Sequence, residues 1–144
     1  ADPLEGLEPA HAVPQEAIGR DRSNPSIRLL GTLAEPGSLS LEIEDAPGLR
    51  FRVLLSFEDP PPWGKRLRAE AFRDDPVFNQ SFGLPELGGT FDAEGRGRIA
   101  LERLAREGGT TLRGKRLQVA YFVQAYEGDP WVRGLSGTRA FELR

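Results

Sequence analysis

Two stretches of the sequence decide the fold: Leu49-Arg50-Phe51-Arg52-Val53-Leu54-Leu55-Ser56-Phe57 and Leu117-Gln118-Val119-Ala120-Tyr121-Phe122-Val123-Gln124-Ala125-Tyr126. In both stretches apolar side chains recur at every second position, which is the period of a half-buried β-strand. The second stretch also carries apolar side chains on its other face, so we expect it to lie at the centre of a sheet. These patterns predict a fold built mainly from strands.

Weaker alternation outside these stretches predicts further strands over residues 26–33, 38–44, 66–72, 89–91, 98–104 and 138–143, although residues 66–72 would also suit a helix. The turn sequence Asp45-Ala46-Pro47-Gly48 separates two strands and predicts a hairpin between them. Residues 101–107 alone have a helical composition, and Gly108-Gly109 ends it. Seven or eight short strands with turn signals between them predict an all-β fold, a two-sheet antiparallel β-sandwich of the Ig-like or jelly-roll-like kind. A small barrel is the alternative.

The first 25 residues lack the strand period and contain four of the twelve prolines. Prolines block a continuous ladder of backbone hydrogen bonds and favour extended conformations. We therefore divide the chain into an extended, proline-rich N-terminal arm (residues 1–25) and a β-sandwich domain (residues 26–144). The arm holds five acidic and two basic residues, which gives it a net charge of −3.

The composition argues against several classes of function. The 144 residues carry a net charge of −3, which argues against nucleic-acid binding, and no apolar run is long enough to span a membrane. The chain has no cysteine, which excludes disulfides and thiol nucleophiles. The N-terminal Ala1-Asp2-Pro3 is typical of what signal peptidase leaves behind. We therefore expect a secreted, extracellular protein of the cell surface.

The ionisable residues argue against catalysis. His11 is the single histidine and lies in the arm, which argues against a Ser-His-Asp triad and rules out a multi-histidine zinc site. The candidates for glycoside hydrolysis are Glu58, Asp59, Asp74 and Asp75, and those for calcium are Asp74, Asp75, Asp92 and Glu94. None has the paired environments of a glycosidase or the spacing of a calcium loop. We therefore expect a non-catalytic protein without metal or cofactor.

Three aromatic residues in predicted loops or at strand ends form a candidate sugar platform: Trp63, Trp131 and Tyr126. Planar side chains stack on the faces of pyranose rings, which makes these residues candidates for polysaccharide binding. The alternative is that the tryptophans cap the core at the ends of the sandwich.

The C-terminal half contains Gly88-Gly89-Thr90-Phe91-Asp92-Ala93-Glu94-Gly95-Arg96-Gly97-Arg98-Ile99, followed by Leu112, Gly114, Leu117-Gln118-Val119, Gln124 and Gly134-Leu135-Ser136. This order of turns and strand ends resembles a module found at the C-terminal ends of exported proteins of planctomycetes and similar bacteria. The resemblance covers residues 83–144, although Glu102-Arg103 and Trp131 depart from its pattern. It implies an extracellular β-sandwich and carries no catalytic residues.

The arm points to self-assembly. A proline-rich segment of this composition orders only against another surface, either a neighbouring copy or its own domain. In strand addition to a neighbour, its apolar residues Leu4, Leu7, Val13 and Ile18 are the anchors. From Arg98 onward nine basic and five acidic residues give a net charge of +4, which suits an acidic arm. We therefore expect a head-to-tail filament or surface fibre, with a carbohydrate- or surface-binding module as the alternative.

Overall fold

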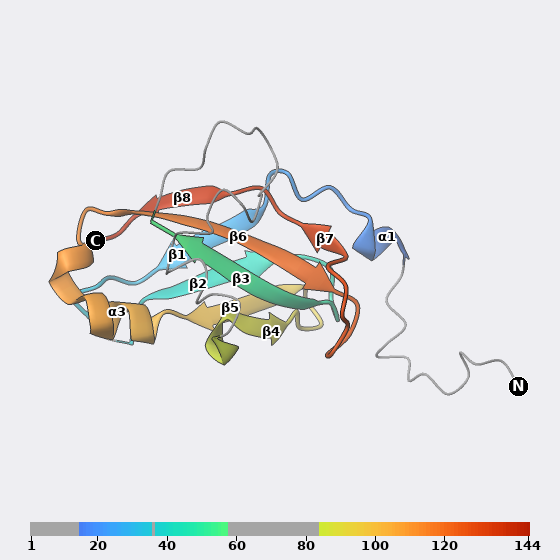
Figure 1. The fold of residues 1–144 in the computed structure, drawn as a ribbon, viewed down its shortest axis with the longest axis horizontal. Helices are drawn as coiled ribbons and strands as arrows, with labels where there is room; N and C mark the ends of the chain where they lie inside the picture. The colour runs from blue at the N-terminus through green and yellow to red at the C-terminus, as the bar shows by residue number, and fades with distance from the viewer. Residues whose placement is uncertain (1–14, 36, 58–83) are drawn as a thin grey trace, which may run out of the picture.

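The computed structural model describes residues 15–35, 37–57 and 84–144. Over these residues the strands form two antiparallel sheets. The smaller sheet has the order β1 (Ser26–Leu30), β2 (Ser40–Glu44), β5 (Arg96–Ala100). The larger has the order β4 (Gly88–Thr90), β3 (Arg50–Ser56), β6 (Arg116–Gln124), β7 (Gly134–Leu135), and β8 (Arg139–Glu142) also pairs with β6. The two-sheet antiparallel β-sandwich is thereby confirmed (Figure 1).

The helical elements are short. Within the described residues they are α1 (Gln15–Ile18), the 3-10 helix η3 (Pro85–Leu87), α3 (Glu102–Gly108) and the 3-10 helix η4 (Gly109–Leu112). None of the helices in the described ranges is long and apolar enough to cross a membrane.

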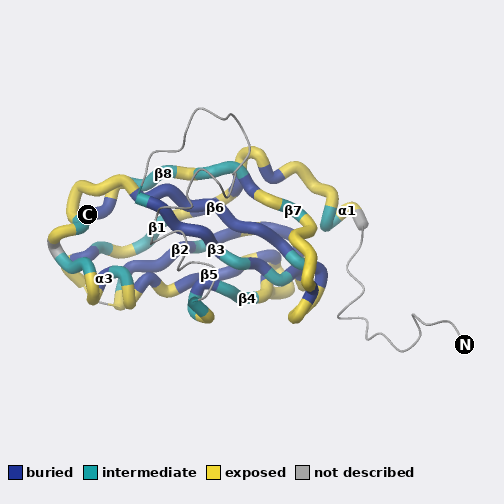
Figure 2. Tube along the Cα trace, in the orientation of Figure 1, coloured by how far each residue is buried: buried dark blue, intermediate teal, exposed yellow. Residues whose placement is uncertain are grey.

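The two stretches that decide the fold are neighbours in the larger sheet. β3 and β6 pair from Arg50 opposite Gln124 to Ser56 opposite Gln118. β6 lies between β3 on one side and β7 and β8 on the other, so its predicted central position is confirmed. Both of its faces are buried over most of its length, which explains why apolar residues occupy both sets of alternating positions (Figure 2).

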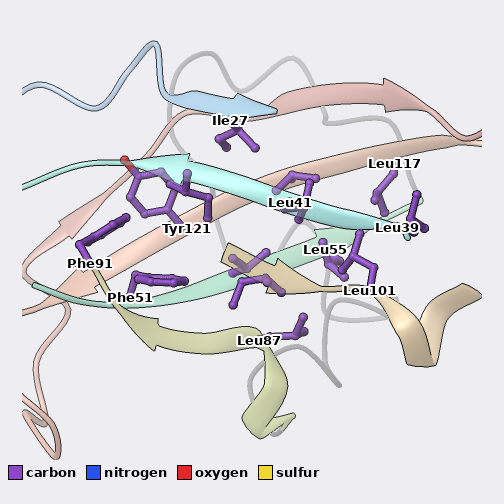
Figure 3. Packing of buried hydrophobic residues seen from close by; sticks show 14 of the residues in the cluster. Ile27, Leu39, Leu41, Phe51, Leu55, Leu87, Phe91, Leu101, Leu117 and Tyr121 are labelled. Carbon is purple, nitrogen blue, oxygen red and sulfur yellow. The ribbon is translucent and has the colours of Figure 1, made fainter. Parts of the chain in front are cut away.

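The core lies between the inner faces of the two sheets. Figure 3 shows aromatic rings gathered toward one end of the core and leucines toward the other. Phe91 lies between Phe51 and Tyr121, with ring centroids 4.5 Å and 6.0 Å away respectively. The smaller sheet contributes fully buried aliphatic residues such as Leu41 and Ile43. The alternation in the sequence is therefore the pattern of side chains that point into this core.

The predicted hairpin at residues 45–48 is wrong. The strands on its two sides, β2 and β3, belong to different sheets, so the turn carries the chain across the sandwich. A second crossing turn, residues 92–95 between β4 and β5, lies against it. The amide of Asp45 donates to the carbonyl of Gly95 at 2.8 Å, and that of Gly48 donates to Phe91 at 3.0 Å. The first turn therefore satisfies its backbone groups with the second turn instead of closing a ladder of its own.

Gly95 has a specific role at this crossing. Its φ is +79°, and a β-carbon there would lie 2.3 Å from the carbonyl oxygen of Asp45. A side chain is excluded because it would occupy the space of the neighbouring turn.

Other boundaries also differ from the prediction. The first strand ends at Leu30 rather than residue 33, and Gly31 follows it with φ of +81°. The strand expected over 98–104 ends at Ala100, and α3 begins at Glu102 because Leu101 and Ala105 bury a helical face. β7 was not predicted, and the strand expected over 66–72 lies outside the described residues.

The described part of the arm does not form a separate extended segment, so the prediction is wrong for residues 15–25. Residues 15–18 form α1, and Ala17 and Ile18 are partly buried against the core. Arg22 is buried. Its guanidinium donates to the carboxylate of Asp45, and this pairing holds the segment against its own domain. Residues 1–14 lie outside the described ranges.

Candidate functional site

A single loop presents the exposed apolar surface of the described chain. We call residues 125–135, which follow β6 and include the two-residue strand β7, the display loop. The exposed large hydrophobic residues of the described ranges are Tyr126, Trp131, Val132 and Leu135, and all four lie in it. Trp131 is 65 % exposed and Val132 is 59 % exposed. Exposed large hydrophobic side chains gathered in one segment are a usual sign of a binding site.

The first half of the loop is a tight turn. The amide of Asp129 donates to the carbonyl of Tyr126 at 3.2 Å, and Gly128 between them has φ of +84°. Glycine is the residue that adopts this left-handed conformation without strain. The Gly128-Asp129 pair therefore reverses the chain directly after β6.

The carboxylate of Asp129 holds the rest of the loop together. It is buried, and it accepts hydrogen bonds from the amide of Ala125 at 3.0 Å and the amide of Trp131 at 3.2 Å. The guanidinium of Arg133 adds two more, from Nε at 2.8 Å and from Nη2 at 3.1 Å. The side-chain amide of Gln124 donates to the Asp129 carbonyl. One residue thus connects both ends of the loop, which fixes the backbone on either side of Trp131.

The protonation of this pair follows from the geometry. The hydrogen bonds from Arg133 hold the pKa of Asp129 below its usual value, and they outweigh the opposing effect of burial. The same hydrogen bonds raise the pKa of Arg133. The pair is therefore ionised at neutral pH, and the loop keeps this brace over the physiological range.

The return strand of the loop is attached to β6. The amide of Arg133 donates to the carbonyl of Val123 at 2.8 Å, and the amide of Ser136 donates to Tyr121 at 2.9 Å. The hydroxyl of Ser136 accepts from the amide of Tyr121 at 2.9 Å. These contacts place the loop at the end of the sandwich that also carries α1 (Figure 1).

A second arginine–aspartate pair anchors residues 15–22 at this end. Arg22 donates to Asp45 from Nε at 2.8 Å and from Nη2 at 3.0 Å. The hydroxyl of Tyr121 donates to the same carboxylate at 2.5 Å. The guanidinium also donates to the carbonyls of Ala17 and Ile18, at 2.6 Å and 2.7 Å. We call Arg22, Asp45 and Tyr121 the anchor cluster, because they connect the N-terminal segment to both sheets.

The anchor cluster is built from buried groups. Burial, helped by the hydrogen bond to Asp45, raises the pKa of the Tyr121 hydroxyl far above its usual value, so the phenol stays protonated. The anchor cluster also borders the display loop, because a β-carbon at Gly134 would lie 2.6 Å from Nη1 of Arg22. The amide of Gly137 donates to the Arg22 carbonyl at 2.8 Å.

The structure places two of the three predicted platform residues, Trp131 and Tyr126, on the display loop, whereas Trp63 lies outside the described residues. Trp131 is exposed, so the alternative in which it caps the core is wrong. Among the predicted arm anchors, Ile18 packs against its own domain. The others, Leu4, Leu7 and Val13, lie outside the described ranges.

Of the ionisable residues considered for catalysis or calcium binding, some support a turn and the others lie outside the described residues. Asp92 accepts hydrogen bonds from the amides of Glu94 at 3.0 Å and Arg96 at 2.9 Å, which is the role of a turn residue. No group of three acidic or histidine side chains able to hold a metal is found within residues 15–35, 37–57 and 84–144. The remaining candidates, His11, Glu58, Asp59, Asp74 and Asp75, lie outside those ranges.

Sequence reasoning missed four residues of the site: Asp129, Val132, Arg133 and Leu135. Asp129 and Arg133 are four residues apart around a Gly-Asp-Pro-Trp turn, and this local spacing was a usable signal for an ion pair. The exposure of Val132 and Leu135 had no such signal, because aliphatic residues are usually buried.

We compared the chain with protein-family models, with curated proteins and with solved structures, and none of them matches it.

Proposed function

We propose that this protein is a non-catalytic extracellular assembly protein, which contacts further copies of itself through the display loop. The observation that carries the proposal is the gathering of all the exposed large hydrophobic residues of the described chain on one loop braced by Asp129. A rigid loop loses little conformational entropy when it binds, so its apolar residues contribute more of their burial energy to affinity.

A protein partner suits this surface better than a sugar does. Tryptophan is among the residues that contribute most to protein–protein affinity, and neighbouring aliphatic side chains exclude water from such a contact. Val132 and Leu135 have no planar face to stack on a pyranose ring, yet both are exposed on the same loop as Trp131.

A second copy is the partner favoured by charge. The arm is acidic and the chain from Arg98 onward is basic, so the arm of one copy complements the C-terminal half of another. In this proposal Leu4, Leu7 and Val13 dock on the neighbour, by strand addition, and Ile18 belongs to its own domain. Contacts of this head-to-tail kind build open filaments when the rotation between copies does not close a ring.

Two observations support the non-catalytic and extracellular parts of the proposal. The buried carboxylates Asp45 and Asp129 are each bound by an arginine, which suits structural support better than proton transfer. The resemblance of residues 83–144 to exported modules favours the cell surface.

The assembly is tested by electron microscopy of negatively stained wild-type protein and the Trp131→Ala/Val132→Ser variant. We expect filaments from the wild type and dispersed particles from the variant. The matched control is Arg106→Ser on α3, an exposed side chain at the opposite end of the sandwich. Filaments that persist in the double variant, or that no form of the protein makes, would contradict the proposal.

The role of the arm needs a separate variant. Replacing Leu4, Leu7 and Val13 with serine removes the three proposed anchors and leaves the anchor cluster intact. Filament formation that is unchanged by these substitutions would remove the arm from the assembly contact while leaving the display loop in it.

Polysaccharide binding is a second candidate, favoured by the 65 % exposure of Trp131 and the presence of Tyr126 on the same loop. Pull-down on insoluble polysaccharides measures it directly. Retention of the wild type that is lost in Trp131→Ala supports this candidate, and equal retention of the two proteins rejects it.

A further inference from the structure

A hollow of about 390 Å³ lies where β8 pairs with β6. The described residues that line it are Arg116, Gln118, Thr138, Arg139, Ala140 and Phe141. It shares no residue with the display loop or with the anchor cluster. Its volume falls within the range of small-ligand sites.

The polar side chain of Gln118 is buried in the sheet. The residue is only 4 % exposed, yet its side-chain amide has no hydrogen-bond partner within residues 15–35, 37–57 and 84–144. A buried amide without a partner destabilises the fold, and native proteins rarely leave one. A ligand in the hollow that accepts a hydrogen bond removes this cost.

The two cations beside Gln118 also have no counter-ion in the part of the chain that the structure describes. Arg116 lies opposite Glu142 in the strand register, and Arg139 lies opposite Val119, but neither arginine forms an ion pair with any carboxylate of the described residues. Two guanidinium groups and one amide therefore present hydrogen-bond donors to the same hollow.

We propose that this hollow is a binding site for an organic carboxylate. A planar carboxylate accepts hydrogen bonds from guanidinium groups in pairs and has further lone pairs for the amide of Gln118 and the hydroxyl of Thr138. Ala140 and Phe141 supply apolar wall for the carbon chain that bears the acid. A bare inorganic anion leaves this wall unused, so an acid on a short hydrocarbon chain is the better match.

The carboxylate has two sources with the same chemistry. One is a free organic acid, and the other is an acidic side chain of the arm, where Asp2, Glu5 and Glu8 lie within the first 14 residues. The site itself does not depend on the assembly proposed above. Where the acid comes from a neighbouring arm, the hollow is the basic surface that receives it.

The test follows the side-chain amide signals of Gln118 by NMR, in the full chain and in its Asp2→Asn/Glu5→Gln/Glu8→Gln variant, during titration with sodium glutarate. We expect a saturable shift that sodium chloride at equal ionic strength does not reproduce. Arg139→Gln weakens the apparent affinity by about tenfold or more, since a charge-assisted hydrogen bond is lost. Arg106→Gln, on α3 and not among the residues that line the hollow, leaves the affinity unchanged.

A synthetic peptide of residues 1–14 distinguishes the two sources. If the arm supplies the acid, the peptide shifts the same signals and its Asp2→Asn/Glu5→Gln/Glu8→Gln form does not. The free-acid source is indicated when glutarate binds and the peptide has no effect. The proposal is overturned if neither probe gives a saturable shift, or if the shift survives Arg139→Gln unchanged. Trp131→Ala keeps glutarate binding in our account, so failure of the display loop and failure of this site are separable.

Discussion

Two arginine–aspartate pairs in this molecule have nearly the same geometry and different consequences. In both, Nε donates to Oδ2 at 2.8 Å, and Nη2 donates to Oδ1, at 3.0 Å for Arg22–Asp45 and 3.1 Å for Arg133–Asp129. The Arg22 side chain is 3 % exposed, whereas that of Arg133 is 36 % exposed. The first pair joins residues 23 apart in sequence, and the second joins residues four apart.

The difference shows that the surroundings of an ion pair decide what it does. Arg22 is buried, so Asp45 rather than water balances its charge. The pair makes the N-terminal segment part of the fold. Arg133 keeps contact with water, so its pairing with Asp129 shapes a local loop whose apolar side chains face outward. The Arg22–Asp45 pair is part of the interior, and the Arg133–Asp129 pair holds an exposed loop in shape.

Removing the carboxylate of the anchor cluster has the largest expected effect on stability. Asp45→Ala leaves the Arg22 guanidinium buried without a counter-ion and the Tyr121 hydroxyl without its acceptor. We expect a loss of about 3–5 kcal/mol in the free energy of unfolding, measured by urea denaturation. The paired variant Arg22→Met/Asp45→Asn removes both charges and should lose less. Equal losses in the two variants would show that the buried charge is not what matters.

The corresponding change in the display loop has a smaller effect. Asp129→Ala leaves the amides of Ala125 and Trp131 without their acceptor, but Arg133 can turn to water. We expect a loss of about 1–3 kcal/mol, with faster hydrogen exchange at those two amides. Asp129→Asn keeps one acceptor oxygen and should lie between the variant and the wild type. Unchanged exchange at Ala125 would reject Asp129 as the brace of the loop.

The lowered pKa of Asp129 predicts a modest dependence on pH. Because the folded state holds this pKa below that of the unfolded chain, the stabilisation is complete above about pH 4, the ordinary value for aspartate. It is lost as the pH falls from there through the folded-state pKa. The acid decline in the urea midpoint should therefore be shallower in Asp129→Asn than in the wild type. Parallel curves for the two proteins would contradict this expectation.

The smallest expected effect on stability comes from the most exposed residue. Trp131→Ala removes a side chain that is 65 % exposed, so the free energy of unfolding should change by no more than about 0.5 kcal/mol. Thermal denaturation of the dilute protein measures this. A loss of several kcal/mol would assign Trp131 to the core and remove the reason for calling the loop a binding surface.

The sequence predicted the strands that depend on local pattern. Alternation over 49–57 and 117–126 follows from which side chains enter the core, so both strands and the central place of β6 could be inferred. The sheet to which each strand belongs could not, because the turn at Asp45 has the composition of a hairpin and yet crosses between sheets. The pairing of Arg22 with Asp45 joins segments that are distant in sequence, so no local pattern predicts it. Trp131 and Tyr126 could be proposed as site residues from their residue type alone. The exposure of Val132 could not, because it depends on how Asp129 holds the loop.

The central claim is that the display loop joins copies of this protein, and sedimentation velocity over a range of concentrations tests it most directly. The account predicts that the mass of the wild type rises with concentration above the 15.9 kDa of one chain. The Trp131→Ala/Val132→Ser variant should stay at that mass while it unfolds at the same urea concentration as the wild type. A wild type that stays at the mass of one chain at every concentration, or a folded variant that associates as the wild type does, would contradict the account.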